Sequence, residues 1–592
     1  MHASATEQSA NQHTLLSIAS LICLSLMIAV PFLVTYHVPP IASFYKEWLT
    51  AVFGVFATLF LVGRNRPTFQ IPVMTFVPLL LIVVLGLQIV VLKPDYWQNQ
   101  FIAMLYMGFA ALMIVLGANL RHVLTVQKVV PTLAWAFTVG ATLIMVLLII
   151  SKFIPQTHML APWILDGRAG NIGQVNHFSN YIALAMASVL YLYFTHRLKQ
   201  TLLLILIALF LIGLAQAGQR MAILYVLLIS VGGWLLLKPI AKSHPLPIRP
   251  AQLLWLIPAF IVAQVLVPYL TFLDPATVPA KRMMNTLGGE STRLILLEQG
   301  WRAFQSSPWL GIGWAEFPWF NYNLTEQYPS LKGMWGHVHN IIAQLFAETG
   351  LIGGLIFLAG VVYWFAGQFT SKLTVEKWWL LALLGIIGAH SLLEFPLWYS
   401  HFLAFASLLI GLSSENALST RFRLAPVCFI MVFVFGCWTL GSIVHDYKQL
   451  EQSITKLRQE GLSPEQVESN LVQFNDLRRQ TLFTHYADNF FVRVLPNSQP
   501  FYADKLSLSQ LVVENWPGRL ETYMHAYLLA VNDQPVEAQQ MMRKAIKQYP
   551  EYREKFHRFV LQRVARGEDR LLPVLIIVQD PYQPDTPNKS DQ

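Results

Sequence analysis

The chain has 592 residues, of which 55% are hydrophobic and only 12% are charged, about half the charged fraction of a soluble domain. That composition excludes an ordinary soluble protein. The net charge of +9 does not indicate a nucleic-acid partner, because basic residues collect in the cytoplasmic loops of membrane proteins. The three cysteines, Cys23, Cys428 and Cys437, fall in apolar segments and match neither a disulfide framework nor a metal motif.

Apolar segments long enough to cross a bilayer follow one another along most of the chain. A spanning helix needs about 20 mostly apolar residues. The first segment has no basic stretch and no clear cleavage site, so we expect it to remain as a span rather than to be removed as a signal peptide. The sequence predicts about thirteen membrane helices, near 14–36, 48–63, 70–92, 99–118, 129–151, 177–195, 201–217, 221–237, 252–272, 343–368, 377–393, 396–413 and 424–444.

The orientation follows from the basic residues between the spans. Every even-numbered span is followed by basic residues, as with Arg64 and Arg66 after the second and Lys238 and Lys242 after the eighth. The positive-inside rule places these loops and the N-terminus in the cytoplasm. The region from about residue 445 onward is then predicted to lie outside.

The region after the last span changes character, because charged residues become frequent. Leu520–Val531 and Val536–Tyr549 are expected to form two amphipathic helices joined by a short turn. Their alanines and large residues at helical spacing, followed by Tyr549 and Pro550, are typical of one tetratricopeptide (TPR)-type hairpin. No second clear copy is present, and the Pro- and Asp-rich tail is expected to be disordered.

The chain is therefore expected to be an all-α polytopic membrane protein with a large outer loop and a small α-helical, TPR-like outer domain. The predicted divisions are N-terminal membrane helices over 1–160, central membrane helices over 161–272, the large loop over 273–342, C-terminal membrane helices over 343–444, the outer helical domain over 445–579 and the tail over 580–592.

Four polar clusters fall at the predicted outer ends of spans: 167–177, 216–220, the long segment 273–340, and 390–399. Polar groups at membrane depth are costly and usually line a site. Because all four clusters lie on the same predicted side, the sequence predicts one pocket open to that side.

Two of these clusters carry candidate ligand-binding residues. In the first, three glycines let the backbone approach a ligand, with Arg168, Gln174 and His177 directed toward it; an ordinary reentrant turn is the alternative. Arg220 begins an apolar helix. It could hold phosphate with help from the helix N-terminus, or its side chain could extend to the membrane interface.

The segment His337-Val338-His339-Asn340 is the strongest candidate for acid–base chemistry, because histidine titrates near neutrality. The two imidazoles would point to different sides of a helix, and no third ligand is near, so a zinc site is not expected. One catalytic histidine, either His337 or His339, is the main hypothesis. A structural, hydrogen-bonded histidine is the alternative.

Further titratable groups have weaker signals. His390 and Glu394 are four residues apart and can meet on one helical face, which favours a structural or orienting role. The loop carboxylates Glu290, Glu298 and Glu316 are expected to be solvated. The tryptophans of the loop could mark the membrane interface or stack on sugar rings, and the sequence does not separate these readings.

The motifs together resemble the Wzy/WaaL superfamily, whose members are O-antigen polymerases, O-antigen ligases and bacterial O-oligosaccharyltransferases. Two further motifs, Gly170–His177 and His390–Tyr399, look more particularly like the PglL-type branch, which glycosylates pilins. The superfamily resemblance rests on Arg293-x8-Arg302, Ser307–Gly313, His337-x-His339-Asn340 and Leu345–Gly353.

This resemblance implies a GT-C-like glycosyltransferase in a bacterial inner membrane, with its active site facing the periplasm. The donor would be an oligosaccharide on undecaprenyl diphosphate. The acceptor would be a serine or threonine of a protein such as a type IV pilin. The family's essential histidine carries over to His339 and its diphosphate-binding arginine to Arg220. Many relatives have serine where this chain has Gly218-Gln219 before that arginine.

The implied mechanism needs no metal and no other cofactor. His339 would remove the acceptor proton as general base, while Arg220, Arg168 and Arg293 would neutralise the departing diphosphate, with inversion at the anomeric carbon. No acidic pair of the DxD kind stands in the outer loops. The loops within 161–272 would bind the donor, and 273–342 would be the catalytic loop.

Three other hypotheses remain open. An O-antigen ligase or polymerase would use the same donor with a different acceptor; the outer helical domain favours a protein acceptor. A transporter of lipid-linked glycan is less favoured, because transporters place polar groups near the bilayer midplane in repeated halves. A non-catalytic assembly platform would use the C-terminal helices.

Overall fold

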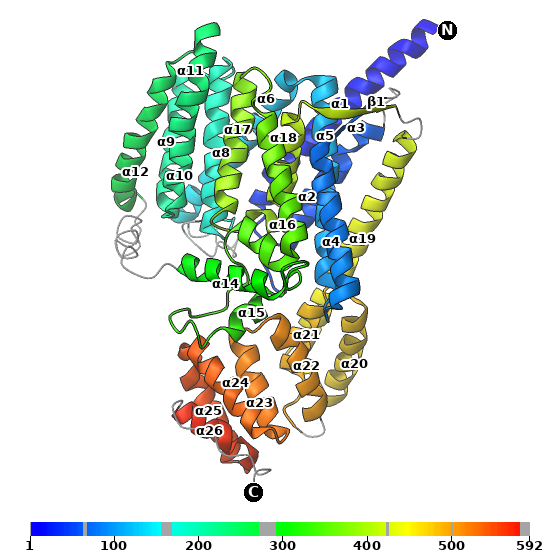
Figure 1. The fold of residues 1–592 in the computed structure, drawn as a ribbon, viewed down its shortest axis with the longest axis vertical. Helices are drawn as coiled ribbons and strands as arrows, with labels where there is room; N and C mark the ends of the chain where they lie inside the picture. The colour runs from blue at the N-terminus through cyan, green and yellow to red at the C-terminus, as the bar shows by residue number, and fades with distance from the viewer. Residues whose placement is uncertain are drawn as a thin grey trace. The chain divides into compact units, whose positions relative to one another are not determined.

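The computed structural model describes residues 2–62, 68–154, 169–270, 292–421, 425–498 and 501–580. The predicted all-α class is confirmed, since 78% of the chain is helical (Figure 1). The chain forms two compact units. Unit 1 comprises 1–82, 105–289 and 356–442; unit 2 comprises 83–104, 290–355 and 443–592.

Unit 1 is a helical bundle with one small sheet. Strands β1 (Thr68–Pro72) and β2 (Ala417–Arg421) pair antiparallel, with Thr68 opposite Arg421. The helical elements that lie wholly within unit 1 are α1 (His2–Leu33), α2 (Phe44–Ala57), α3 (Leu59–Val62), η1 (Val73–Thr75), α6 (Val126–Phe153), α8 (Val175–Phe194), α9 (Gln200–Ala217), α10 (Met221–Leu227), η2 (Leu228–Gly232), α11 (Gly233–Ser243), η3 (Pro250–Trp255), α12 (Leu256–Leu270), α17 (Val375–Ser391), η5 (Pro396–Trp398) and α18 (Ser400–Ser413).

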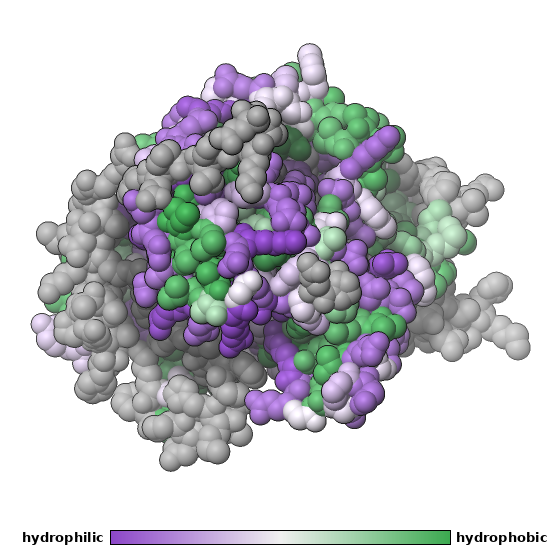
Figure 2. All heavy atoms as spheres, turned by 90° about the horizontal axis from the view of Figure 1, so that it is seen from below, coloured by the Kyte–Doolittle hydropathy of each residue, from purple (hydrophilic) through white to green (hydrophobic). Residues whose placement is uncertain are grey.

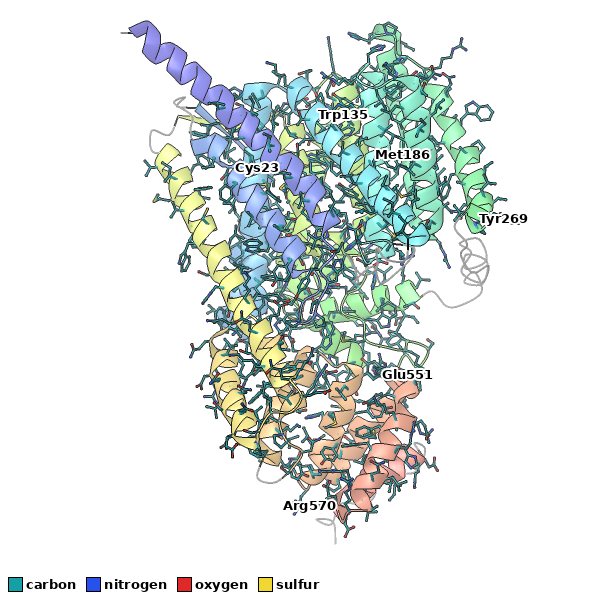
Figure 3. All side chains as sticks on the ribbon, turned by 180° about the vertical axis from the view of Figure 1, so that it is seen from behind. Cys23, Trp135, Met186, Tyr269, Glu551 and Arg570 are labelled. Carbon is teal, nitrogen blue, oxygen red and sulfur yellow. The ribbon has the colours of Figure 1, made fainter. Side chains whose placement is uncertain are left out.

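Helix α8 forms the centre of this bundle. Of its 20 residues, the 18 from His177 to Phe194 are buried, as expected for a helix whose faces all carry small or apolar side chains. Met186 of α8 is fully buried, whereas Trp135 of α6 and Tyr269 of α12 are exposed (Figure 3). Exposed apolar side chains on long helices are the pattern of a surface that faces lipid.

Four long helices contribute residues to both units: α4 (Phe76–Leu92), α5 (Gln98–Leu124), α16 (Ile341–Gly367) and α19 (Ala425–Leu457). The remaining elements belong to unit 2: α14 (Thr292–Ser306), α15 (Phe317–Asn323), α20 (Pro464–Gln480), α21 (Thr484–Val494), α22 (Tyr502–Asn515), α23 (Arg519–Val531), α24 (Pro535–Gln548), η6 (Pro550–Tyr552), α25 (Arg553–Val564), η7 (Asp569–Leu571) and α26 (Leu572–Gln579).

The C-terminal helices of unit 2 include the hairpin that the sequence predicts. Helices α23 and α24 share a hydrophobic core with α25 and α26, centred on buried residues such as Tyr523, Ala538 and Val574. Seen from below, hydrophilic residues are interleaved with smaller apolar patches (Figure 2). The predicted tail from 581 lies outside the described residues.

Every predicted span coincides with a helix, and the chain is a multi-pass membrane protein. Ten helices in the described ranges are long and apolar enough to cross a bilayer. The other three predicted spans correspond to α8, α17 and α18; the last two have 17 and 14 residues. The number thirteen and the predicted domain boundaries stay predictions.

Candidate functional site

The backbone around His339 is held in an uncommon conformation. His339 has φ of 59°, in the left-handed region that residues other than glycine seldom adopt and that recurs at functional sites. The Trp335 ring lies 5.5 Å from its ring, centroid to centroid. The next residue, Asn340, caps α16. Its side-chain oxygen accepts hydrogen bonds from the N–H groups of Ile342 (3.1 Å) and Ala343 (3.0 Å).

Val338, between the two histidines, anchors the segment to α14. Its side chain is fully buried, and a Cβ added at Gly300 of α14 would lie 2.9 Å from one of its methyl groups. Its N–H donates to the side-chain oxygen of Gln344 at 2.6 Å. Desolvation, followed by the proximity of His339, lowers the pKa of His337 to about 3. His337 is therefore neutral at neutral pH and a weak base.

Helix α16 is broken at Gly350, where φ is 64° and ψ is −162°. The run Ser307–Gly313 fills the break and satisfies backbone groups that a regular helix would pair internally. Four hydrogen bonds join the two segments: Ile312 N–H to Ala347 O (3.0 Å), Gly313 N–H to Glu348 O (3.2 Å), Leu351 N–H to Pro308 O (2.7 Å) and Ile352 N–H to Trp309 O (3.4 Å).

Two glycines permit this close approach. A Cβ at Gly311 would lie 2.3 Å from the carbonyl carbon of Glu348, and one at Gly350 would lie 2.4 Å from the carbonyl of Trp309. Both residues also have positive φ. Two of the motifs that carry the family resemblance are thus the two halves of one backbone junction, which lies within α16 beyond the histidine segment.

A buried polar network that the sequence reasoning missed supports this junction. Gln88 of α4 is fully buried; its amide nitrogen donates to the carbonyls of Leu310 (2.7 Å) and Glu348 (2.6 Å), and its oxygen accepts from the N–H of Trp314 (3.2 Å). The Glu348 carboxylate accepts from the N–H of Ala315 at 3.2 Å. In the sequence, this network was indicated only by the amide of Gln88 and the carboxylate of Glu348, each inside a predicted apolar span.

The arginines of α14 have different surroundings. Arg293 is half-buried in the first turn. Arg302 pairs with Glu298 at 2.8 Å, and the Tyr328 hydroxyl donates to the same carboxylate at 2.7 Å. Hydrogen bonds from Tyr328 and Arg302 lower the pKa of Glu298. Glu298 is exposed, as expected, and Arg302 is engaged in this surface network.

Glu316 differs from the expectation of a solvated carboxylate. It is partly buried. Desolvation, with the nearby charges of Asp95 and Glu514, raises its pKa to about 7. The sequence could not show this, because the desolvation and the like charges come from distant parts of the chain. Glu290 lies outside the described residues.

In unit 1, Arg220 lies where the sequence places it, exposed and directly before α10. The chain turns there because Gly218 caps α9 in the left-handed conformation, with φ of 66°. Gln174 directly precedes α8 and is half-buried. Arg168 lies outside the described residues.

Two predicted histidines of unit 1 meet at one end of the bundle. The rings of His177 and His390 are 5.9 Å apart, and both residues are buried. His401 and Tyr399 join them, at 5.8 Å and 4.7 Å from His177. Glu394 follows one turn after His390, whose carbonyl accepts from the Glu394 N–H at 2.8 Å. Sequence reasoning missed His401, although it lies two residues after the 390–399 motif.

The loop before α8 is clamped by side chains that the sequence reasoning also missed. The Lys46 ammonium donates to the carbonyl of Ile172 at 2.8 Å, and the His37 ring donates to the carbonyl of Asn171 at 2.7 Å. The Asn171 amide in turn donates to the carbonyl of Phe32. Lys46 is buried within α2, whereas the sequence predicts it in the short loop before the span 48–63, so the pattern gave no signal of this contact.

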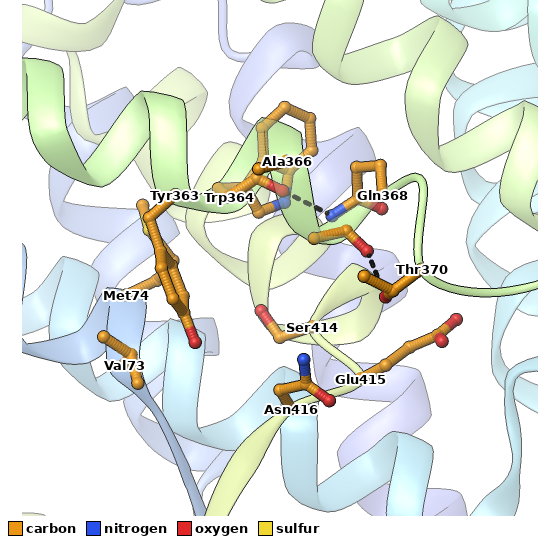
Figure 4. Close-up of a pocket in the computed structure, with 11 residues that line it drawn as sticks. Val73, Met74, Tyr363, Trp364, Ala366, Gln368, Thr370, Ser414, Glu415 and Asn416 are labelled. Carbon is orange, nitrogen blue, oxygen red and sulfur yellow. Dashed lines mark hydrogen bonds between the residues drawn. The ribbon is translucent and has the colours of Figure 1, made fainter.

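A surface pocket in unit 1 is a different feature (Figure 4). It lies at the end of α18 away from His401, about 21 Å along a helix of 14 residues. None of the predicted site residues lines it. The lining side chains include Val73, Tyr363, Trp364, Gln368, Ser414, Glu415 and Asn416.

The predicted site residues therefore fall in both units. His337, His339, Asn340 and Arg293 belong to unit 2; Arg220, Gln174, His177, His390 and Glu394 belong to unit 1. A single cavity shared by His339 and Arg220 stays a prediction. Over the described ranges, no three His, Cys, Asp or Glu side chains are arranged to hold a metal ion.

Comparisons with known proteins agree with the motifs. The O-antigen ligase family profile matches residues 202–358, and the profile of the C-terminal part of virulence factor membrane-bound polymerases matches 378–564. A general O-oligosaccharyltransferase of Acinetobacter baylyi is 24% identical over 548 residues, which cover 88% of this chain and 91% of the relative. A ComP-specific O-oligosaccharyltransferase of the same organism is 24% identical over 409 residues, or 68% and 72%.

The first profile includes Arg220 and His339, and the second includes His390 and most of the C-terminal helices. The activity class that these matches support is that of O-antigen ligases and O-oligosaccharyltransferases. The resemblance drawn from the motifs is thereby confirmed: the chain is similar to the Wzy/WaaL superfamily and, within it, to O-oligosaccharyltransferases of the PglL type.

Proposed function

We propose that the protein is an O-oligosaccharyltransferase. It transfers a preassembled glycan from undecaprenyl diphosphate to a serine or threonine of an acceptor protein, such as a type IV pilin, at the periplasmic face of a bacterial inner membrane. The observation that carries this proposal is the similarity to a general O-oligosaccharyltransferase over 88% of this chain and 91% of the relative. Similarity over nearly the whole length includes the membrane helices, the loop and the C-terminal helices.

His339 is the proposed general base. An aliphatic hydroxyl has a pKa far above neutrality, so its attack on the sugar needs a group that accepts the proton. The left-handed backbone of His339 and the Asn340 cap beside it support a fixed position for the ring. His337 is less suited, because a group with a pKa of about 3 accepts a proton poorly at neutral pH.

The proposed leaving group is the lipid diphosphate. As the acceptor oxygen bonds to C1 of the sugar, the bond from C1 to the diphosphate oxygen breaks, and the acceptor proton passes to His339. One displacement inverts C1. Arg220, Arg168 and Arg293 would stabilise the released negative charge. The position of Arg220 before α10 supports this role, since a helix N-terminus also attracts phosphate.

Gln174, His177, His390 and Glu394 are proposed to support the donor site from unit 1. They lie at one end of helices α8 and α17, where buried imidazoles need partners. The mechanism uses no metal ion. Full transfer in the presence of a chelator is the expected result.

An O-antigen ligase is the second candidate, because that family profile matches residues 202–358. The two activities differ only in the acceptor. The purified protein in nanodiscs, given lipid-linked donor, should therefore be offered a pilin and a lipid A core in separate reactions. Added glycan mass on the pilin supports the proposal, whereas added glycan on the lipid alone identifies a ligase.

His339→Ala tests the base assignment in the same assay. We expect glycan transfer to disappear while membrane insertion and abundance stay normal. The loss of a general base typically costs about 10²- to 10⁴-fold in rate. Transfer at the wild-type rate in this variant would remove His339 from the mechanism without changing the assignment of the substrate.

A further inference from the structure

Helix α14 runs across the lower end of α16 and is joined to it (Figure 1). The rings of Phe304 in α14 and Phe346 in α16 are 5.7 Å apart, edge to face. Just beyond α14, the carbonyl of Trp309 accepts from the N–H of Ile352 at 3.4 Å. These contacts lie within unit 2, and α16 is long and apolar enough to cross a membrane. Trp309 therefore lies beside Ile352, a residue of this candidate membrane span.

Three sides of α14 have different surroundings. The side that includes Leu296 and Ala303 is buried against the rest of unit 2. A second side carries the exposed Glu298–Arg302 pair. Next to this pair, two large apolar side chains are open: Leu294 is 67% exposed and Trp301, two turns later, is 57% exposed, with Glu298 and Gln305 bordering them. Large apolar side chains grouped on a surface indicate a binding partner.

The exposed apolar surface continues from α14 onto α16. Trp309 is 67% exposed, and beside it Ile352 and Leu355 of the span are 41% and 48% exposed. Apolar side chains that point outward from a membrane span face lipid. Tryptophan is enriched where the hydrocarbon meets the headgroups. The bilayer that covers Ile352 and Leu355 thus extends over Trp309 and the apolar side of α14.

We propose that α14 is an interfacial helix, with Leu294, Trp301 and Trp309 immersed at the boundary between headgroups and acyl chains, and that its partner is the phospholipid bilayer. The polar Glu298–Arg302 side faces water, as in other amphipathic helices that lie in the membrane surface. The buried side of α14 holds Val338, between the two histidines. The helix consequently fixes the height of the histidine segment at the membrane surface, whatever substrate the site takes.

The test measures the depth of single nitroxide labels on the full-length protein. Cys23, Cys428 and Cys437 are first replaced by alanine. Labels are then placed by Leu294→Cys, Trp301→Cys and Trp309→Cys, with Ile352→Cys as the lipid reference and the exposed Ser330→Cys as the water reference within unit 2. In donor-free nanodiscs of phosphatidylethanolamine and phosphatidylglycerol, power saturation compares collisions with oxygen, which enters lipid, and with a water-soluble nickel chelate.

We expect the oxygen-to-nickel accessibility ratio at 294, 301 and 309 to approach that at Ile352 and to exceed that at Ser330 several-fold. Ratios like that at Ser330 would overturn the proposal. A lipid-like ratio that arises only after undecaprenyl phosphate is added would assign the surface to the donor chain instead. Shielding from both reagents, with a short label-to-label distance between molecules, would assign it to a second copy. Three positions report independently, so one misfolded variant leaves the test intact.

Discussion

At the scale of single residues, His337 and His339 show that two histidines only two positions apart can have different surroundings. Burial and the neighbouring imidazole lower the pKa of His337 to about 3. His339 has the strained backbone that often marks a functional residue. The two histidines thus differ in surroundings that the motif alone does not reveal, while the choice of His339 as base stays a proposal.

The variant His337→Gln tests this choice. Because a group with a pKa of about 3 takes up no proton at neutral pH, its replacement by a neutral hydrogen-bonding side chain should change kcat by less than about tenfold, well below the loss expected for a general base. Rates of glycan transfer, compared with those of His339→Gln, provide the measurement. A larger loss in His337→Gln than in His339→Gln would reverse the assignment.

Glu316 predicts a pH dependence of stability. The folded protein binds the Glu316 proton more tightly than the unfolded chain, since its pKa is about 7 instead of 4.5. Stability therefore falls as pH rises from about 4.5 to 7. Glu316→Gln should raise the unfolding temperature at pH 8, with a gain that shrinks toward pH 5. The control Glu298→Gln, whose carboxylate is stabilised by Tyr328 and Arg302, should show no such gain.

At the scale of elements, the broken helix α16 and the run Ser307–Gly313 form one structural device. The break at Gly350 frees backbone groups inside a membrane span, and the loop supplies their partners. This device anchors the segment between α14 and α15 to α16, the helix that the histidine segment precedes. Its glycines allow the positive φ angles and the close backbone contact, and they have no side chain that could take part in a reaction.

Gly350→Ala should destabilise the protein by more than about 2 kcal/mol, because alanine is strained at positive φ and its Cβ would overlap the Trp309 carbonyl. Gly367→Ala, in the same helix, is the control; its Cβ would meet nothing within 4 Å. Thermal unfolding in detergent provides the measurement. Equal midpoints for the two variants would mean that the junction tolerates a side chain.

At the scale of the whole molecule, unit 2 joins parts of the chain that are distant in sequence. The buried Gln548 of α24 connects the C-terminal helices with the outer loop. Its side chain donates to the carbonyl of Gly333 and accepts from the Thr325 hydroxyl, and its carbonyl accepts from the N–H of Gly333 at 3.0 Å. The C-terminal helices consequently support the loop that carries His339, in addition to any contact with an acceptor.

Gln548→Leu should loosen the outer loop, because the loss of its hydrogen bonds leaves buried polar groups unpaired at about 1–3 kcal/mol each. Faster hydrogen exchange over residues 324–334 is the expected result. Lys547→Ala is the matched control, since its exposed pair with Glu326, at 3.7 Å, contributes little. Exchange that is equally fast in both variants would refute the supporting role.

The sequence by itself determined the fold class and the approximate positions of the helices, and it carries the family resemblance. Hydrophobic runs of about 20 residues need no tertiary information, because the bilayer demands them locally. The predicted hairpin likewise matches α23 and α24. Arg220 was placed correctly because a helix start depends on neighbouring residues, and Gly218 before it ends α9.

Only the tertiary structure decided the environments of the side chains. The burial of Glu316, the clamp from Lys46 to Ile172 and the insertion of Gln88 beside Glu348 all join segments that are far apart in the chain. Local patterns cannot predict such contacts, because desolvation and hydrogen bonding depend on which segments meet in space. The sequence therefore named His339 and Arg220 as candidates, while the fold alone set the backbone, partners and packing around them.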